Sequence, residues 1–303
     1  MSDIANIYQI SYSHETRKIL DPGFKVIGDE TNPRPEWFEY WHIRKFFLSE
    51  ILDQNKFYGF LSPKFCEKTR LKSAEIYRFI RENSAADVIM FSPYLDQSAL
   101  FLNIVEQGWF AHPELKTIFD HICKRYFGNI DHEILVTTSE NTVFCNFFVA
   151  KPDFWARWFE ICEDIFLRTE EGSSDFGKEI AGVTRYKTTS APIRTFVIER
   201  IATLIMSTES KWKKANYPSF DCAVGKMSVA KSTSTLLALD SLKRVYVETR
   251  SPEYLLGYFN LRHTLLKGTT LAELEHSPNS PCGAVFTYTQ YLLKKLNLGF
   301  MIS

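Results

Sequence analysis

Three sets of charged residues in this chain have types and a spacing that could do chemistry. Lys64 and Lys68 follow a Ser-Pro pair, and Asp96 follows a second Ser-Pro pair. Glu199 and Arg200 interrupt an otherwise apolar run. Lysine and arginine can neutralise a phosphate, and a carboxylate can take a proton from a hydroxyl group. The alternative for the lysines is that both are simply solvated at the surface.

The second Ser-Pro pair lies where a buried strand turns into a helix. Residues 88–91 are a short apolar run typical of a strand covered on both faces, and Ser92 and Pro93 end it. The following residues change to helical spacing. Ligands of open α/β sheets bind at the carboxyl ends of the strands, which favours Ser92 and Asp96 as ligand-binding residues. In the alternative interpretation Asp96 only caps the helix.

Apolar runs of strand type alternate with helical patterns along the first two thirds of the chain. This order predicts an α/β fold with a mixed, mainly parallel sheet flanked by helices. We predict strands near 4–12, 56–61, 87–92, 134–138 and 142–150. We predict helices at 35–48, 73–83, 97–106, 114–126, 154–167 and 191–206, with a loop at 170–190. Helices at 236–250, 252–266 and 287–298 would form a helical C-terminal lobe, so the expected domains are 1–206 and 207–303.

Composition narrows the classes of function. The 36 basic and 36 acidic residues cancel, which argues against nucleic acid as a partner. The six cysteines are scattered without a CxxC pair, so reduced thiols are expected rather than a zinc site or disulfides. The first residues show no signal-peptide pattern, and no window of 18 residues is apolar and uncharged. We therefore expect a cytoplasmic protein.

The adjacent charges Glu199 and Arg200 are the most demanding feature of the sequence. Their side chains point about 100° apart on a helix, so the two cannot simply satisfy one another. Each needs another partner, because an unpaired charge is costly to bury. A ligand crevice would supply one, and a buried salt bridge to another element is the alternative.

Three segments together resemble bacterial capsular and lipopolysaccharide glycosyltransferases of the GT-A type. The first is the opening strand that ends in Ser11-Tyr12, with residues 58–65 after it, and the second is 87–113. The third is Asn-Phe-Phe-Val-Ala-Lys-Pro-Asp-Phe-Trp at 146–155, with 196–200 downstream. Residues 37–113 also resemble domains fused to O-antigen polymerising enzymes, one of them implicated in galactofuranose transfer. The resemblance covers about residues 4–206.

The resemblance implies a hexosyltransferase with a nucleotide-diphosphate sugar as donor and a growing surface polysaccharide or lipid-linked glycan as acceptor. It places the donor at the first strand and the middle segment, and the acceptor over the third segment. The implied catalytic residues are Asp96 and Glu199. The implied donor-binding residues are Tyr12, Ser62, Lys64, Lys68, Ser92 and Arg200. The implied acceptor-binding residues are His112, Asn146 and Lys151.

The sequence departs from this family in one respect. Many GT-A enzymes hold Mg²⁺ or Mn²⁺ with an Asp-x-Asp motif, and no Asp-x-Asp occurs here. Asp96 is the one carboxylate in the corresponding place, so it would be the metal ligand if a divalent metal is used. A metal-free site in which Lys64, Lys68 or Arg200 neutralises the diphosphate is equally consistent with the chemistry.

Two further alternatives stay open from the sequence. The chain could be a catalytically inactive module of the same fold that binds glycan or a partner glycosyltransferase. A phosphatase or kinase is disfavoured, because no Gly-rich phosphate loop and no G-x-S-x-G motif appears. Finally, the five lysines between Lys211 and Lys231 could contact the anionic inner face of a membrane, or could belong to a solvated linker.

Overall fold

The computed structural model describes residues 4–28, 31–92, 94–186, 189–218, 232–267, 282–296 and 298. The chain forms two compact units, and neither is continuous in sequence. The first unit comprises residues 1–93, 143–184 and 190–223, and the second comprises 94–142, 185–189 and 224–303. Since the units do not divide the chain at a single point, the boundary after residue 206 stays a prediction.

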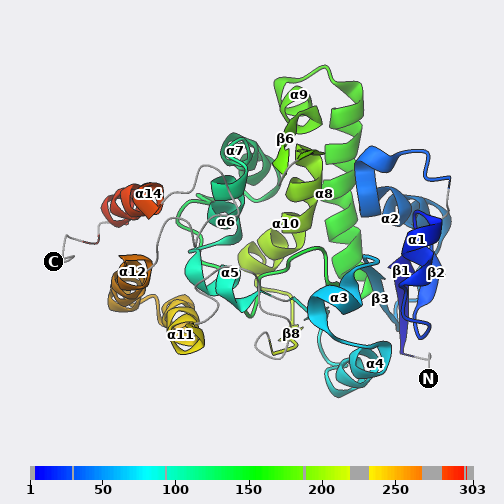
Figure 1. Cartoon of the computed structure of the whole chain (residues 1–303), viewed down its shortest axis with the longest axis horizontal. Helices are drawn as coiled ribbons and strands as arrows, with labels where there is room; N and C mark the ends of the chain where they lie inside the picture. The colour runs from blue at the N-terminus through cyan, green and yellow to red at the C-terminus, as the bar shows by residue number, and fades with distance from the viewer. Residues whose placement is uncertain are drawn as a thin grey trace. The chain divides into compact units, whose positions relative to one another are not determined.

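The first unit contains a mixed six-stranded sheet (Figure 1). Its strands lie in the order β2-β1-β3-β5-β4-β8, and β5 alone runs antiparallel to its neighbours. The α/β class and the mainly parallel sheet are thus confirmed. The strands are β1 (Ala5–Ile10), β2 (Lys25–Ile27), β3 (Phe57–Leu61), β4 (Val88–Met90), β5 (Phe148–Ala150) and β8 (Lys214–Asn216).

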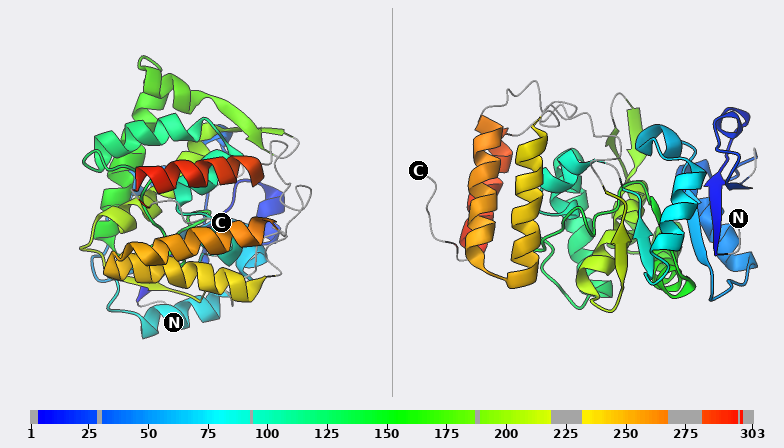
Figure 2. Two further views of the ribbon diagram at one scale, coloured as in Figure 1. Left: turned by 90° about the vertical axis from the view of Figure 1, so that its left-hand side faces the viewer. Right: turned by 90° about the horizontal axis from the view of Figure 1, so that it is seen from below.

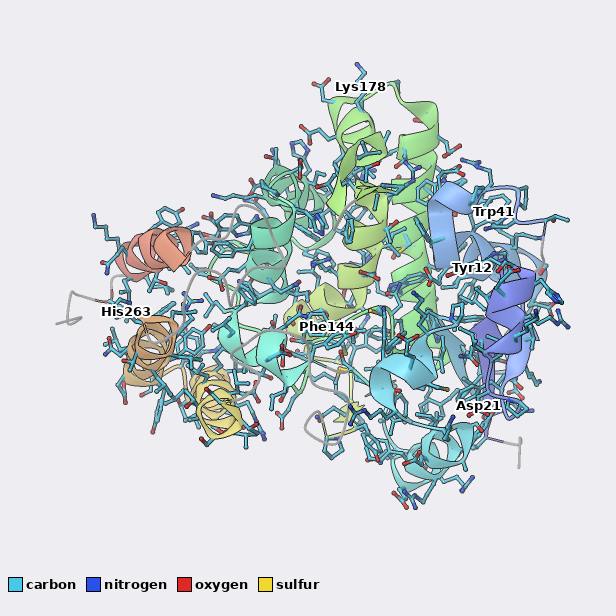
Figure 3. The ribbon with its side chains drawn as sticks, viewed as in Figure 1. Tyr12, Asp21, Trp41, Phe144, Lys178 and His263 are labelled. Atoms are coloured by element: carbon cyan, nitrogen blue, oxygen red, sulfur yellow. The ribbon has the colours of Figure 1, made fainter. Side chains whose placement is uncertain are left out.

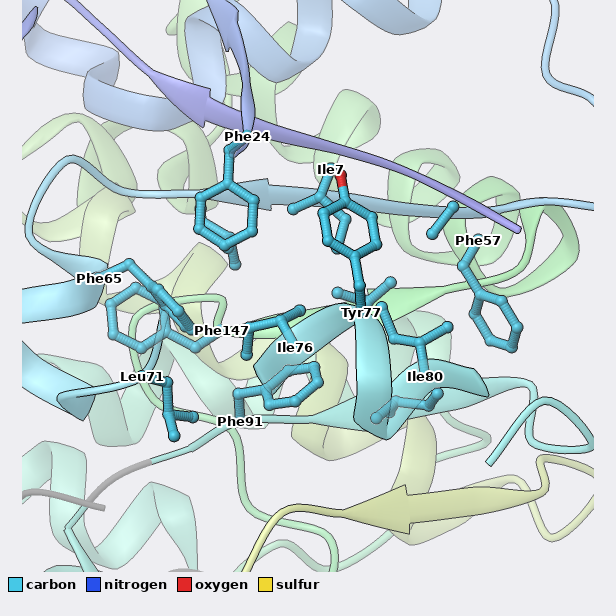
Figure 4. Packing of buried hydrophobic residues seen from close by; sticks show 14 of the residues in the cluster. Ile7, Phe24, Phe57, Phe65, Leu71, Ile76, Tyr77, Ile80, Phe91 and Phe147 are labelled. Atoms are coloured by element: carbon cyan, nitrogen blue, oxygen red, sulfur yellow. The ribbon is translucent and has the colours of Figure 1, made fainter. Parts of the chain in front are cut away.

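Helices cover both faces of this sheet, which explains why its central strands are apolar at every position. On one face, α4 (Ser73–Glu82) packs Ile76 and Ile80 into a cluster with Ile7, as Figure 4 shows. On the other face, α2 (Phe38–Ser49) and α8 (Pro152–Glu171) contribute aromatic rings. Trp155 of α8, for example, packs against Phe60 and Phe148 at centroid distances of 5.0 and 4.4 Å.

The remaining helices of the first unit extend this framework. They are α1 (His14–Lys18), the 3-10 helix η1 (Pro35–Trp37), α3 (Phe65–Thr69), α9 (Asp175–Ala181) and α10 (Ile193–Thr208). Two short strands, β6 (Val183–Tyr186) and β7 (Thr189–Pro192), pair with each other. α10 is buried along most of its length, as its apolar sequence predicts.

The second unit is helical in its described part. It contains α5 (Leu95–Leu100), α6 (Ile104–Ala111), α7 (Leu115–Tyr126), α11 (Thr233–Thr249), α12 (Pro252–Lys267) and α14 (Cys282–Lys295). Figure 2 shows α11, α12 and α14 next to one another. Leu100, Leu239 and Tyr258 lie in the shared apolar core of this unit. None of the helices in the described residues has the length and apolar character needed to cross a membrane.

Several predicted elements are wrong. Residues 134–138 and 142–147 form no strand, and the helix expected at 97–106 is broken between α5 and α6. α6 extends to Ala111, five residues beyond the predicted helix end at residue 106. The expected loop at 170–190 contains α9 and β6. The edge strands β2 and β8 were not predicted, because both are short and largely exposed.

Candidate functional site

The candidate site lies in the first unit, at the edge of the sheet where β1 and β3 end. β1 and β3 are parallel, so the residues after both strands share one edge. β5 runs antiparallel, with Phe148 opposite Met90, so the residues before β5 reach this same edge. Tyr12, Lys64 and the pair Cys145-Asn146 are therefore brought to one side of the sheet.

The order of the strands marks this edge as a ligand site. β2 and β3, the next two strands in the chain, lie on opposite sides of β1. The connections therefore diverge between β1 and β3, and such a switch point leaves a crevice outside the carboxyl ends of the strands. Tyr12, labelled in Figure 3, follows β1 at this point, and Lys64 follows β3.

The two predicted lysines occupy different environments. Lys64 is exposed and precedes the first turn of α3. Lys68 is half-buried, and its Nζ donates a hydrogen bond to Cys145 Sγ at 3.1 Å and lies 5.6 Å from the centre of the Phe147 ring. Burial raises the pKa of the Cys145 thiol to about 12, with the Glu199 charge contributing in the same direction. The thiol is therefore protonated at neutral pH and is a poor nucleophile.

Two carboxyl groups accompany these lysines. Burial raises the pKa of Glu39, on α2, although Lys68 and Lys64 oppose the rise. Burial also raises the pKa of Glu199, on α10, against the opposing charges of Arg200 and Lys68, and the charge of Glu39 adds to the rise. A carboxylate with a raised pKa is a stronger base at neutral pH than an ordinary one. Glu39 and Glu199 are thus candidates for proton transfer.

Both carboxyl groups belong to residues that line one small, open pocket. Its lining residues are Trp37, Phe38, Glu39, Tyr40, Asn146, Thr195, Ile198 and Glu199. Asn146 Oδ1 and Thr195 Oγ1 are buried and have no hydrogen-bond partner among the described residues. An unsatisfied buried polar group costs about 1–3 kcal/mol, so these two atoms favour a site prepared for a ligand.

The backbone around this pocket is strained. Cys145 and Asn146 both have left-handed conformations, with φ of 57° and 54°. Phe38 has φ 44° and ψ −130°, which is unfavourable for a residue with a side chain. Each such conformation costs on the order of 1–3 kcal/mol and persists only where the surrounding structure imposes it. Strain of this kind concentrates at ligand sites.

Arg200 and Tyr12 complete the set of predicted residues at this site. Arg200 is buried, and its Nη1 donates to the Phe196 carbonyl at 2.7 Å. Burial lowers the pKa of Arg200 to about 10, with the charge of Glu199 opposing that change. Burial raises the pKa of Tyr12 to about 12, Glu39 adds to the rise, and Lys68 opposes it. These electrostatic influences link Tyr12, Lys68, Glu39, Glu199 and Arg200 in one cluster.

Other predicted residues of the first unit are placed differently. The Ser62 carbonyl accepts a hydrogen bond from Gln9 Nε2, and Ser92 Oγ accepts one from the Phe144 amide at 2.8 Å, so Ser92 supports the chain. Lys151 follows β5 and therefore lies at the opposite edge of the sheet from Asn146. The structure does not bring the predicted acceptor residues Asn146 and Lys151 together.

Two predicted residues belong to the second unit. Asp96 is fully buried in the first turn of α5, and His112 is buried at the end of α6. That Asp96 shares a ligand site with Lys64, and His112 with Asn146, stays a prediction. In the basic stretch, Lys211 lies 3.6 Å from Glu209, and Lys214 Nζ donates to the Met206 carbonyl at 3.3 Å.

Two other lysines of that stretch, Lys226 and Lys231, lie outside the described residues. The membrane contact of the stretch stays a prediction.

Sequence reasoning missed Glu39, Cys145 and Thr195. The signal for Glu39 was available, because it is a lone carboxylate among the aromatic residues 37–41. Cys145 and Thr195 carried no such signal. Cys145 is placed by the left-handed backbone before β5, and Thr195 is placed by the packing of α10.

The residues present do not fit a divalent metal site. No group of three or more His, Cys, Asp or Glu side chains within the described ranges could hold a metal ion. Glu39 and Glu199 are subject to the positive charges of Lys64, Lys68 and Arg200, which disfavour a dication.

Family models, curated proteins and solved structures were compared with the chain, and none of these comparisons found a match. The geometry of the site is therefore what supports any function.

Proposed function

We propose that the chain is a glycosyltransferase of GT-A-like fold that moves a sugar from a nucleotide-diphosphate donor to a hydroxyl group of a glycan acceptor. One observation carries the proposal. At the switch point of the sheet, residues that can neutralise a diphosphate lie in one electrostatic cluster with carboxyl groups that can take a proton. Sugar transfer needs both functions.

In the proposed reaction, the acceptor oxygen forms a bond to the anomeric carbon of the donor sugar. The bond between that carbon and the diphosphate oxygen breaks, and the electron pair leaves with the nucleoside diphosphate. Lys64 and Lys68 stabilise the charge that develops on this leaving group. Glu199 takes the proton of the acceptor hydroxyl, for which its raised pKa is suited.

The acceptor class in this proposal is a growing surface polysaccharide or a lipid-linked glycan. This part rests on the resemblance of residues 146–155 and 196–200 to the capsular and lipopolysaccharide transferases. Partner glycosyltransferases would then extend or supply the same glycan.

A glycan-binding module without catalysis is the second candidate. The observation that favours it is Ser92, whose hydroxyl oxygen accepts a hydrogen bond from the Phe144 amide and so holds the chain in place. Such a module would bind glycan but would have no need for a nucleoside diphosphate. Nucleotide binding therefore separates the two candidates.

Calorimetric titration with UDP, ADP, GDP and CDP tests the proposal on the full chain. We expect one of them to bind, and we expect the double variant K64A/K68A to lose at least tenfold in affinity. K178A is the matched control, because Lys178 is an exposed lysine on α9 in the same unit (Figure 3). The proposal fails if none of the four nucleotides binds, or if K64A/K68A and K178A bind equally well.

A further inference from the structure

The polar atoms of the pocket mostly accept hydrogen bonds. Asn146 is 7% exposed, and its Oδ1 has no partner among the described residues. Thr195 Oγ1 is unpartnered in the same sense, and the carboxyl groups of Glu39 and Glu199 can accept more than one bond each. A ligand that donates several hydrogen bonds therefore suits these atoms.

Such a ligand could carry an ammonium group or a set of hydroxyl groups, and charge decides between them. The negative charges of Glu39 and Glu199 are offset by three cations that influence them electrostatically, Lys64, Lys68 and Arg200. The cluster therefore has no excess negative charge to attract a cation. A neutral ligand with several hydroxyl groups fits better.

The pocket also offers an apolar surface of suitable kind. Phe38 lies in the pocket lining, has a strained backbone and is 37% exposed. An exposed ring beside oxygen acceptors suits a ligand with an apolar face and polar edges.

We infer that this pocket binds adjacent hydroxyl groups of a sugar ring, which donate to Glu39, Glu199 and Asn146 while Phe38 contacts the ring. The inference rests on the proposed function, because it identifies the acceptor sugar's site in the first unit. Glu39 and Asn146 are positioning residues here: they hold the ring so that one hydroxyl group faces Glu199. The acceptor site is then built from Glu39, Asn146 and Thr195 without Lys151.

Saturation-transfer NMR on the full chain, with and without UDP, tests the inference. The probes are a panel of methyl glycosides of common hexoses and pentoses, with tetrahydropyran-2-methanol as a ring that lacks adjacent hydroxyl groups. We expect at least one glycoside to bind and tetrahydropyran-2-methanol not to bind. Equal signals from both kinds of probe would overturn the inference, and so would the absence of binding by every glycoside.

Three variants locate the binding. E39A and N146G should each weaken the bound glycoside at least tenfold, and glycine keeps the left-handed conformation that position 146 needs. E160A is the matched control, since Glu160 is an exposed carboxylate on α8. Unchanged affinity in both E39A and N146G would place the glycoside elsewhere and overturn the inference. Since N146G introduces no strain, it serves as the test even if E39A unfolds.

The outcome is separable from that of the proposed function. If a nucleotide binds and no glycoside does, the pocket inference fails and the transferase proposal stands. If a glycoside binds through Glu39 and Asn146 and no nucleotide binds, the pocket inference stands and the chain is a glycan-binding module.

Discussion

The buried ion pair of the second unit and the pocket of the first unit differ in how their polar groups are satisfied. In the second unit, Arg262 Nη1 lies 2.9 Å from Glu106 Oε1, and Arg262 Nη2 donates to Thr289 Oγ1 at 2.6 Å. Lys243 Nζ donates to three backbone carbonyls, two of them at 2.7 Å. Glu106, Arg262 and Lys243 thus have partners inside the protein, as a structural role requires.

The first unit leaves comparable groups without such partners. Asn146 Oδ1 and Thr195 Oγ1 have none among the described residues, and Glu39 and Glu199 have raised pKa values because burial disfavours their charge. The contrast shows that a buried charge is not by itself a sign of function. At the candidate site, two buried polar atoms beside the carboxyl groups have no hydrogen-bond partner among the described residues.

The largest expected effect concerns catalysis in the first unit. E199Q should lower the rate of sugar transfer by about 10²–10⁴-fold, because it removes the proposed base while keeping the size of the side chain. In the parent chain, transfer should decline as the pH falls through the raised pKa of Glu199, which lies above its usual value of 4.5. Rates measured from pH 4 to pH 8 with the donor identified by calorimetry test this, and equal rates in parent and E199Q would exclude Glu199 as the base.

The matching substitution in the second unit should act on stability instead. E106Q leaves Arg262 buried without a carboxylate, which should lower the free energy of unfolding by about 3–5 kcal/mol. E199Q should change it by less than about 1 kcal/mol. Urea denaturation of both variants measures the difference. A larger loss in E199Q than in E106Q would contradict the comparison.

The units should also differ in the pH dependence of stability. Burial opposes the ionisation of Glu133, but contacts with Lys116, Lys295 and Tyr291 outweigh it and hold its pKa at about 2. Because this pKa is depressed from 4.5, ionised Glu133 stabilises the fold above about pH 4.5 by about 3 kcal/mol, and this stability is lost as the pH falls towards 2.

The pKa values of Glu39 and Glu199 are raised, so their effect on stability changes with pH in the opposite direction. Their contribution is fully present below pH 4.5 and is lost as the pH rises through the folded pKa of each. The free energy of unfolding, measured by denaturation at pH 3, 5 and 7, should fall between pH 5 and pH 3 in the parent chain. E133Q should remove much of this decrease, and E199Q should not. If the free energy of unfolding of E133Q decreases at low pH as much as that of the parent, Glu133 does not cause the decrease.

The smallest expected effect comes from a matched pair of threonines. T289V should cost about 1.5–3 kcal/mol, because it leaves an Arg262 donor unsatisfied. T195V should lie within about 0.5 kcal/mol of the parent or be stabilising, because its hydroxyl makes no hydrogen bond to the described residues. Thermal denaturation of the two variants gives the comparison, which a destabilised T195V would contradict.

The sequence predicted the central strands because burial on both faces leaves a continuous apolar run. The same signal was misleading at 134–138 and 142–147. Val136 belongs to the apolar core of the helical unit, and the Val143 amide donates to Thr203 Oγ1 on α10 at 2.8 Å. Apolar composition predicts that such residues are buried, but it does not predict whether they form a strand or only pack against helices.

The candidate site was partly predictable for a similar reason. Tyr12 and Lys64 could be assigned to the site because they follow predicted strands. Glu199 and Arg200 could be assigned because burying charged side chains in an apolar helix is costly. Glu39 and Thr195 could not, because their place in the pocket follows from packing between helices that are far apart in sequence. The grouping of Lys151 with Asn146 failed because β5 lies between them: Asn146 precedes the strand and Lys151 follows it, so they reach opposite edges of the sheet.

The connection between β4 and β5 has a consequence for how this chain can vary. The Phe91 amide donates to the Phe147 carbonyl at 2.9 Å, and Ser92 and Phe144 are also hydrogen-bonded, so residues 94–142 leave and re-enter the first unit between two adjoining points. Lengthening a loop between fixed ends costs little, about 0.6 kcal/mol for each doubling. Loops between Ser92 and Phe144 could be lengthened while the register of β4 with β5 is kept, whereas α5 and α6 supply the partners of Lys243 and Arg262. The insertion is therefore a natural point for grafting and for recombination.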